Sequence, residues 1–194
     1  YYWCSDKNKK KEAEDLPPEE GVPPIIFMGD PAGGPPDTCV EVMDNTIMFY
    51  GEVNEKNAKL LNKSIRTLDK ELQVFKLKFG CDSPPLRLFI SSYGGSVFAG
   101  FSIMDTIKNC TTPVHTYIDG SAASAATLIS VVAKKRFIFP NSFMLIHQLS
   151  SSMWGNYESM KDEMENLDLI MGKIKKIYKE HTNMNMRQIT EILK

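Results

Sequence analysis

The sequence lacks most of the features that would set it apart from ordinary globular proteins. No apolar run reaches the roughly 18 residues that indicate a transmembrane helix, and no signal peptide is recognisable. There is no excess charge, because 23 Lys and Arg face 24 Asp and Glu and the net charge is −1. A chain this neutral has no general attraction to nucleic acid or to an anionic membrane, and we expect neither as a partner.

Metal and disulfide motifs are also missing. None of the four cysteines forms C-x-x-C, and no histidine lies at metal-ligand spacing from another. Neither a P-loop nor G-x-G-x-x-G is present, which argues against nucleotide binding. Scattered thiols are typical of a reducing compartment, so we expect an intracellular location, either cytoplasmic or in the matrix or stroma of an organelle.

What is present indicates one domain preceded by a tail. Hydrophobic residues make up 42% of the 194 residues and charged residues 24%, which are ordinary values for a folded domain. Residues 1–41 differ from the rest, because seven of the eleven prolines fall in the first 36 residues beside a run of mixed charge. We interpret 1–41 as a polar, Pro-rich tail or linker, with at most a short apolar anchor at Pro24–Phe27, and expect the domain over 42–194.

Strand and helix patterns alternate along the domain. Strands are predicted over 46–50, 86–90, 114–118, 136–139 and 143–146, with helices over 54–72, 98–107 and from about 124 to 132. Phe89 faces away from its apolar neighbours, as in a strand buried on both sides. Regular β-α-β alternation with short connections predicts an α/β fold with a mainly parallel, helix-covered sheet.

One long helix is predicted from about Tyr157 to Glu180. Its apolar residues recur at spacings of four and three, at Met160, Met164, Leu167, Met171, Ile174 and Tyr178, with Ile170 and Ile177 beside them. Such a stripe either faces the core of its own domain or packs against the same helix of another subunit.

Three short segments contain residues suited to chemistry. Gly94-Gly95 follows a strand, and the missing Cβ atoms would let a substrate backbone approach, although a tight turn explains the pair equally well. Ser124 lies at the start of a helix among small residues, either as an N-cap or as a nucleophile. His147 follows a strand, where ligands bind to α/β sheets, and is either structural or a general base for Ser124.

Together these segments resemble a known family. Tyr93-Gly94-Gly95, Gly120-Ser121-Ala122-Ala123-Ser124 and Pro140-Asn141-Ser142 followed by Met144 to Gln148 are similar to the motifs of the ClpP family of self-compartmentalising serine peptidases, in the same order and at similar spacings. The resemblance extends over about residues 42–194. It implies the ClpP/crotonase-like fold, which consists of repeated β-α-β units with a protruding handle helix.

The resemblance also implies the functional roles. Ser124 would be the nucleophile and His147 the general base, and the backbone N–H groups of Gly95 and Ala125 would form the oxyanion hole. Tyr93 and Gly94 would lie in the loop beside the substrate strand. The implied protein is a serine endopeptidase without cofactor or metal, in a homo- or hetero-oligomeric pair of stacked heptameric rings. Its partners would be an AAA+ unfoldase and unfolded polypeptide substrates.

Several features depart from the family pattern. Tyr93 stands where the family usually has proline, the link between Ser124 and Pro140 looks about two residues shorter than usual, and residues 1–41 do not match the short N-terminal loops of the family. The third member of the family's triad, an aspartate, would fall just after Leu193, whereas the chain ends at Lys194. We expect truncation before this aspartate, and before the last helix and strand, rather than evolutionary loss.

Two other functions stay open at this point. A non-catalytic ring subunit or scaffold would explain a missing acid, but not the presence of both Ser124 and His147. A crotonase-like acyl-CoA hydratase or isomerase would share the fold, but such enzymes generally use carboxylates at these positions.

Overall fold

The computed structural model describes residues 39–152 and 154–194. The first element is an antiparallel hairpin of β1 (Val40–Met43) and β2 (Thr46–Tyr50), turned at Asp44 with φ 53°. The first strand thus begins at Val40, two residues before the predicted start of the domain at Val42. The rest of the tail, with its suggested anchor at Pro24–Phe27, lies outside the described residues.

The sheet is otherwise parallel, as predicted. Its strands follow the order β1-β2-β3-β4-β5, with β3 spanning Leu86–Ser92, β4 Val114–Ala123 and β5 Lys135–Ile138. The short strand β6 (Phe143–Leu145) pairs with the last part of β4. On the same side, β4 thus pairs first with β5 and then, along its last part, with β6.

The prediction that β4 would end near Ile118 was wrong. Between Ile90 and Ser92 on β3, the pairing on β4 jumps from Ile118 to Ala122, which marks a bulge. Gly120 lies in this bulge with φ 91°, and its N–H donates to Ser142 Oγ at 2.8 Å. Glycine within a strand often marks such an irregularity, and here it switches the partner of β4 from β5 to β6.

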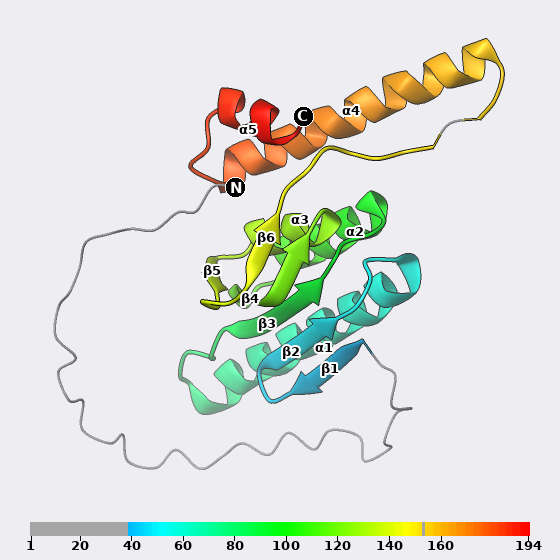
Figure 1. Cartoon of the computed structure of the whole chain (residues 1–194). Helices are drawn as coiled ribbons and strands as arrows, with labels where there is room; N and C mark the ends of the chain where they lie inside the picture. The colour runs from blue at the N-terminus through cyan, green and yellow to red at the C-terminus, as the bar shows by residue number, and fades with distance from the viewer. Residues whose placement is uncertain (1–38, 153) are drawn as a thin grey trace, which may run out of the picture.

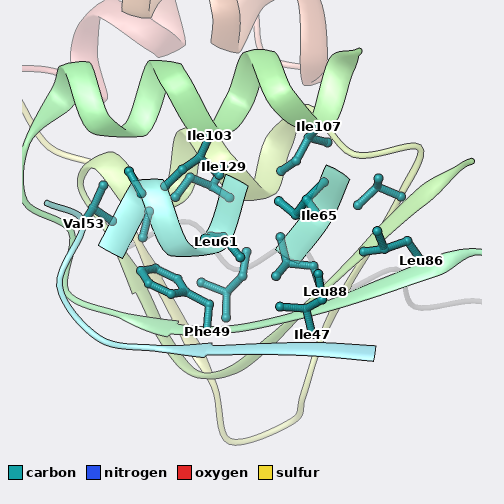
Figure 2. Packing of buried hydrophobic residues seen from close by; sticks show 14 of the residues in the cluster. Ile47, Phe49, Val53, Leu61, Ile65, Leu86, Leu88, Ile103, Ile107 and Ile129 are labelled. Carbon is teal, nitrogen blue, oxygen red and sulfur yellow. The ribbon is translucent and has the colours of Figure 1, made fainter. Parts of the chain in front are cut away.

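Three helices cover one face of the sheet (Figure 1). They are α1 (Glu55–Phe79), α2 (Val97–Lys108) and α3 (Ala125–Val131). Asn54 caps α1 by accepting from the Asn57 N–H at 2.9 Å, as its position predicted. Residues such as Phe49, Leu61 and Leu88 fill the space between helices and sheet (Figure 2), and all three are fully buried.

The opposite face of the sheet is not covered by a helix within the described residues. Phe89, Tyr117 and Phe137 stack there with ring centroids 4.8 and 4.7 Å apart, and the Arg87 guanidinium lies 5.2 Å from two of these rings. Phe89 is only partly buried and Phe137 is exposed. The prediction that Phe89 belongs to a strand buried on both sides was therefore wrong.

The last two helices form a separate arm. The long helix α4 (Tyr157–His181) extends beyond the body of the molecule, and α5 (Met186–Ile192) folds back beside its C-terminal part (Figure 1). Ile174, Ile177 and Tyr178 pack with Leu128 of α3 and Ile189 of α5 in a second apolar cluster. Asn156 caps α4, and Asn185 forms a capping box on α5.

The apolar stripe of α4 is divided between these surroundings. Ile174 and Tyr178 are buried within the chain, whereas Met160 and Met164 keep 40% and 52% of their surface exposed. The stripe therefore serves the core only along its C-terminal half. No helix in the described ranges is both long and apolar enough to cross a membrane.

Candidate active site

Three turns meet at the carboxyl edge of the parallel sheet. In the register of the strands, Ser92 of β3 lies opposite Ala122 of β4, and Ala123 lies opposite Leu145 of β6. The residues that follow these strands therefore lie along one edge, where α/β sheets commonly bind ligands. This arrangement brings the segments of Gly94-Gly95, Ser124 and His147 to the same edge of the sheet.

Ser124 forms a sharp strand-to-helix turn between β4 and α3. Its backbone angles are φ 54° and ψ −126°, a combination that costs a non-glycine residue about 1–3 kcal/mol. The turn is held on one side by the Ser124 N–H, which donates to the Leu145 carbonyl at 2.9 Å. On the other side, the Ser124 carbonyl accepts from the Thr127 N–H at 3.0 Å. A strained serine between a strand and a helix is typical of an exposed nucleophile.

The side chain of Ser124 does not cap its helix. The residue occupies the N-cap position of α3 but makes no side-chain cap hydrogen bond. The structural interpretation of Ser124 as an ordinary N-cap is therefore wrong. Ser124 is half-buried, and its hydroxyl is available for another interaction.

The Gly94-Gly95 turn packs directly against this serine. A Cβ atom on Gly94 would lie 2.6 Å from both the Ala123 carbonyl oxygen and Ser124 Cβ. A Cβ on Gly95 would lie 2.4 Å from the carbonyl oxygen of Val53, which pairs with this loop. Both glycines have positive φ, 93° and 141°. The turn thus needs glycine for its close contacts as well as for its conformation.

Two backbone N–H groups at this site are without an acceptor. Within residues 39–152 and 154–194, no carbonyl or side chain accepts from the N–H of Gly95 or of Ala125. Ala125 is the first residue of α3, where N–H groups have no partner inside the helix and the helix dipole favours negative charge. These are the two donors that the sequence resemblance implied for an oxyanion hole.

His147 lies two residues beyond Leu145, the last residue of β6, whose carbonyl accepts from the Ser124 N–H. Its ring is exposed, and Nδ1 lies 2.6 Å from the Gln148 carbonyl oxygen. Among the described residues, no carboxylate and no serine hydroxyl hydrogen-bonds to this ring. Asp119 is engaged elsewhere, since it accepts from the Tyr50 hydroxyl at 2.6 Å. Tyr93 is exposed in the loop that precedes the glycines.

One part of the site was missed from the sequence. Thr127 Oγ1 lies 2.5 Å from the Ser124 carbonyl oxygen and 2.5 Å from the Tyr178 hydroxyl, so α4 is connected to the serine turn. The position of Thr127, three residues after Ser124, was the available signal, because threonine in a first helical turn often bonds back to the backbone. Tyr178 was counted only as part of the apolar stripe.

Over the described part of the chain, no group of three His, Cys, Asp or Glu side chains could hold a metal ion. The candidate groups along this edge are the Ser124 hydroxyl, the His147 imidazole and the backbone N–H groups of Gly95 and Ala125. Together with the parallel sheet, they define an α/β protein whose candidate functional groups follow the carboxyl ends of its strands.

Comparison with known proteins identifies the family. Residues 37–194 match the family model described as Clp protease. The chain is 34% identical to an ATP-dependent Clp protease proteolytic subunit of Cyanophora paradoxa over 164 residues, which cover 74% of the chain and 84% of that protein. It is 32% identical to the ATP-dependent Clp protease proteolytic subunit 2 of Treponema denticola over 159 residues, with coverage of 80% and 75%.

A solved structure agrees with these sequence matches. A mutant of ClpP1 from Listeria monocytogenes superimposes with a TM-score of 0.65 and 27% identity, over 76% of the chain and 78% of that structure. The chain therefore belongs to the Clp protease family, and the predicted α/β fold of the ClpP type is confirmed. The roles of the individual site residues stay predictions.

Proposed function

We propose that this chain is a serine endopeptidase subunit of a Clp-type protease, with Ser124 as nucleophile and His147 as general base. The observation that carries the proposal is the conformation of Ser124. Its strained turn presents an uncapped hydroxyl beside two backbone N–H groups that have no acceptor within the described residues.

The proposed reaction uses these groups together with His147. Ser124 Oγ attacks the carbonyl carbon of a peptide bond while His147 takes the hydroxyl proton. The carbonyl oxygen becomes an oxyanion, which the N–H groups of Gly95 and Ala125 stabilise by about 3 kcal/mol each. His147 then gives its proton to the leaving amine, and water hydrolyses the acyl-enzyme with the same imidazole as base.

His147 needs a partner to act in this way. A carboxylate on Nδ1 holds the imidazole in the correct tautomer, and losing it lowers turnover in comparable triads by about 10⁴. In the described part of the chain, Nδ1 faces the Gln148 carbonyl instead. This observation favours a second candidate, a ClpP-like ring subunit that supports assembly without catalysis.

Assembly and partners belong to the same proposal. The exposed Met160 and Met164 on the projecting half of α4 support packing between subunits, in homo- or hetero-oligomeric rings. The curated relatives are proteolytic subunits of ATP-dependent Clp proteases, which supports an ATP-driven unfoldase as partner and unfolded polypeptides as substrates. The free thiols of Cys39, Cys81 and Cys110 support a reducing, intracellular location.

Hydrolysis of a fluorogenic peptide and of unfolded casein tests the proposal. Ser124→Ala should reduce both activities to background, whereas Ser121→Ala, a matched change three residues earlier on β4, should leave them within about two-fold. Equal activity of Ser124→Ala and the parent would remove Ser124 from the reaction. A parent without activity in a fully assembled particle would favour the non-catalytic subunit.

A further inference from the structure

The hydroxyl of Tyr178 is a buried polar group in an otherwise apolar cluster. Only 2% of the residue is exposed, and it lies on the C-terminal half of α4 beside Leu128 and Ile177. Its only hydrogen-bond partner within the described residues is Thr127 Oγ1, at 2.5 Å. Burying a phenol hydroxyl among apolar side chains costs free energy unless the hydroxyl is hydrogen-bonded, so the contact with Thr127 fixes the orientation of the Tyr178 ring.

The direction of the two hydrogen bonds follows from the number of protons. Thr127 has one hydroxyl proton, and it is donated to the Ser124 carbonyl oxygen at 2.5 Å. The Tyr178 hydroxyl must therefore donate to Thr127 Oγ1. Burial raises the pKa of Tyr178 to about 12. The phenol is therefore protonated at neutral pH.

The Ser124 carbonyl belongs to the same rigid unit as a candidate oxyanion donor. A trans peptide is planar, and its C=O and N–H point in opposite directions. The carbonyl of Ser124 and the N–H of Ala125 share one such plane. Whatever fixes the direction of the carbonyl therefore also fixes the direction of the Ala125 N–H.

Two donors from Thr127 fix this carbonyl. Its N–H reaches the oxygen at 3.0 Å and its hydroxyl at 2.5 Å. The plane needs such restraint, because Ser124 is held in a strained conformation that could relax by rotating the peptide. The Tyr178 hydroxyl holds the Thr127 hydroxyl in the rotamer that makes the second bond.

We infer that Tyr178 is a positioning residue for the oxyanion hole, acting through Thr127 and the Ser124–Ala125 peptide. This inference rests on the proposed peptidase function and deepens it. It assigns to α4 a contribution to catalysis within its own subunit. Tyr178 contacts neither the substrate nor the reacting atoms, so its effect is on the alignment of a donor.

The test compares variants of the full chain that differ in the hydrogen bonds but not in the fold. Tyr178→Phe removes only the hydroxyl, and Thr127→Val replaces the threonine hydroxyl with a methyl group. Thr127→Ser restores a hydroxyl and serves as the rescue. Ile177→Val is the matched control, because it trims a buried neighbour on the same helix and in the same apolar cluster.

For Tyr178→Phe and Thr127→Val, we expect kcat to fall about ten-fold with KM unchanged, since an oxyanion donor acts mainly in the transition state. Affinity for a peptide aldehyde, whose adduct places an oxyanion in the hole, should fall by the same factor. Thr127→Ser should recover most of kcat, and Ile177→Val should stay within two-fold of the parent. Equal losses in Tyr178→Phe and Ile177→Val, or a change confined to KM, would overturn the assignment.

A readout without activity separates this inference from the proposed function. Hydrogen–deuterium exchange at the Thr127 amide, which bonds to the Ser124 carbonyl, reports whether the turn is held. Tyr178→Phe should raise its exchange rate at least five-fold over Ile177→Val at matched stability. An unchanged rate overturns the inference even if the parent hydrolyses peptides. If Tyr178→Phe raises the exchange rate but the parent hydrolyses no peptide, the coupling of Tyr178 to the Ser124 turn is retained and only the proposed function is rejected.

Discussion

Replacing Gly95 with alanine should inactivate the site while leaving most of the fold in place. The added Cβ would lie 2.4 Å from the Val53 carbonyl oxygen, about 1 Å closer than ordinary van der Waals contact. Val53 is fully buried, and its N–H donates to the Gly94 carbonyl at 2.8 Å while its carbonyl accepts from the Ser96 N–H at 2.7 Å. Because Val53 is packed in the main apolar core, the glycine loop is the part that must move.

The size of the effect follows from the displaced donor. Loss of one oxyanion-hole donor costs roughly 10²- to 10³-fold in kcat. Alanine at a φ of 141° adds about 1–3 kcal/mol of backbone strain, which should appear as lower stability. We expect kcat/KM for a fluorogenic peptide to fall at least 100-fold when it is measured well below the unfolding midpoint.

Gly172→Ala is the matched control. Gly172 lies within α4, and a Cβ there would have nothing within 4 Å. The change should keep full activity and stabilise the helix by about 0.5–1 kcal/mol. A folded Gly95→Ala protein with the activity of the parent would refute the assignment of Gly95 to the oxyanion hole.

Three further predictions concern assembly and stability. Met160→Glu with Met164→Glu should lower the molar mass measured by light scattering without changing far-UV circular dichroism, because each methionine side chain buried between subunits contributes about 1.5–3 kcal/mol. Asp69→Asn should lower the free energy of unfolding by about 1–3 kcal/mol, since the buried carboxylate accepts from the N–H groups of Thr112 at 2.7 Å and Thr111 at 3.2 Å. Stability in urea should fall between pH 7.5 and pH 5, because burial and nearby cations lower the pKa of His181.

The sign of the last prediction follows from proton binding. A histidine whose pKa is lower in the folded state binds its proton more readily when unfolded, so acid favours unfolding as pH falls through and below 6.5. His181→Gln should reduce this pH dependence. Burial alone would raise the pKa of Asp69, but the hydrogen bonds from Thr112 outweigh burial, so the pKa is lowered overall. The contribution of the Asp69 carboxylate to stability is therefore present at neutral pH and is lost only at more acid pH.

Each of these predictions can fail clearly. For assembly, the control is Leu77→Glu at an exposed site on α1, and a double methionine variant with unchanged mass would mean that α4 serves only its own core. We avoid Ile174 in this test because it is buried inside the chain, where a charge would disrupt the fold itself. If Asp69→Asn unfolds at the same urea midpoint as the parent, the role of the carboxylate is contradicted. If His181→Gln leaves the pH dependence of stability unaltered, the role of His181 is contradicted.

The sequence predicted the elements that have strong periodicity. The alternation of strands and helices indicated the parallel sheet, and the spacing of apolar residues placed α4 almost to the residue. Short elements were harder to predict. No side chain of β1 is fully buried, so the strand has no buried apolar pattern to indicate it. Gly120 suggested the end of a strand where the structure has a bulge.

The segments of the candidate site could be predicted from the sequence, but their geometry could not. Glycine, serine and histidine in three separate motifs indicated which segments matter, because parallel strands bring their carboxyl ends to one edge. The strained angles of Ser124 could not be predicted, since they depend on β6 and Gly94 packing against it from distant parts of the chain. The link from Tyr178 to Thr127 spans 51 residues and has no local signal.

Labelling with a fluorophosphonate probe tests the central claim most directly. The probe reacts only with an activated serine, and tandem mass spectrometry of the labelled protein identifies the modified residue. The assignment predicts a single adduct on Ser124, which is lost in His147→Ala, where no base remains, and reduced in Gly95→Ala. A folded, assembled protein that stays unlabelled, or that carries its adduct on another serine, would contradict it.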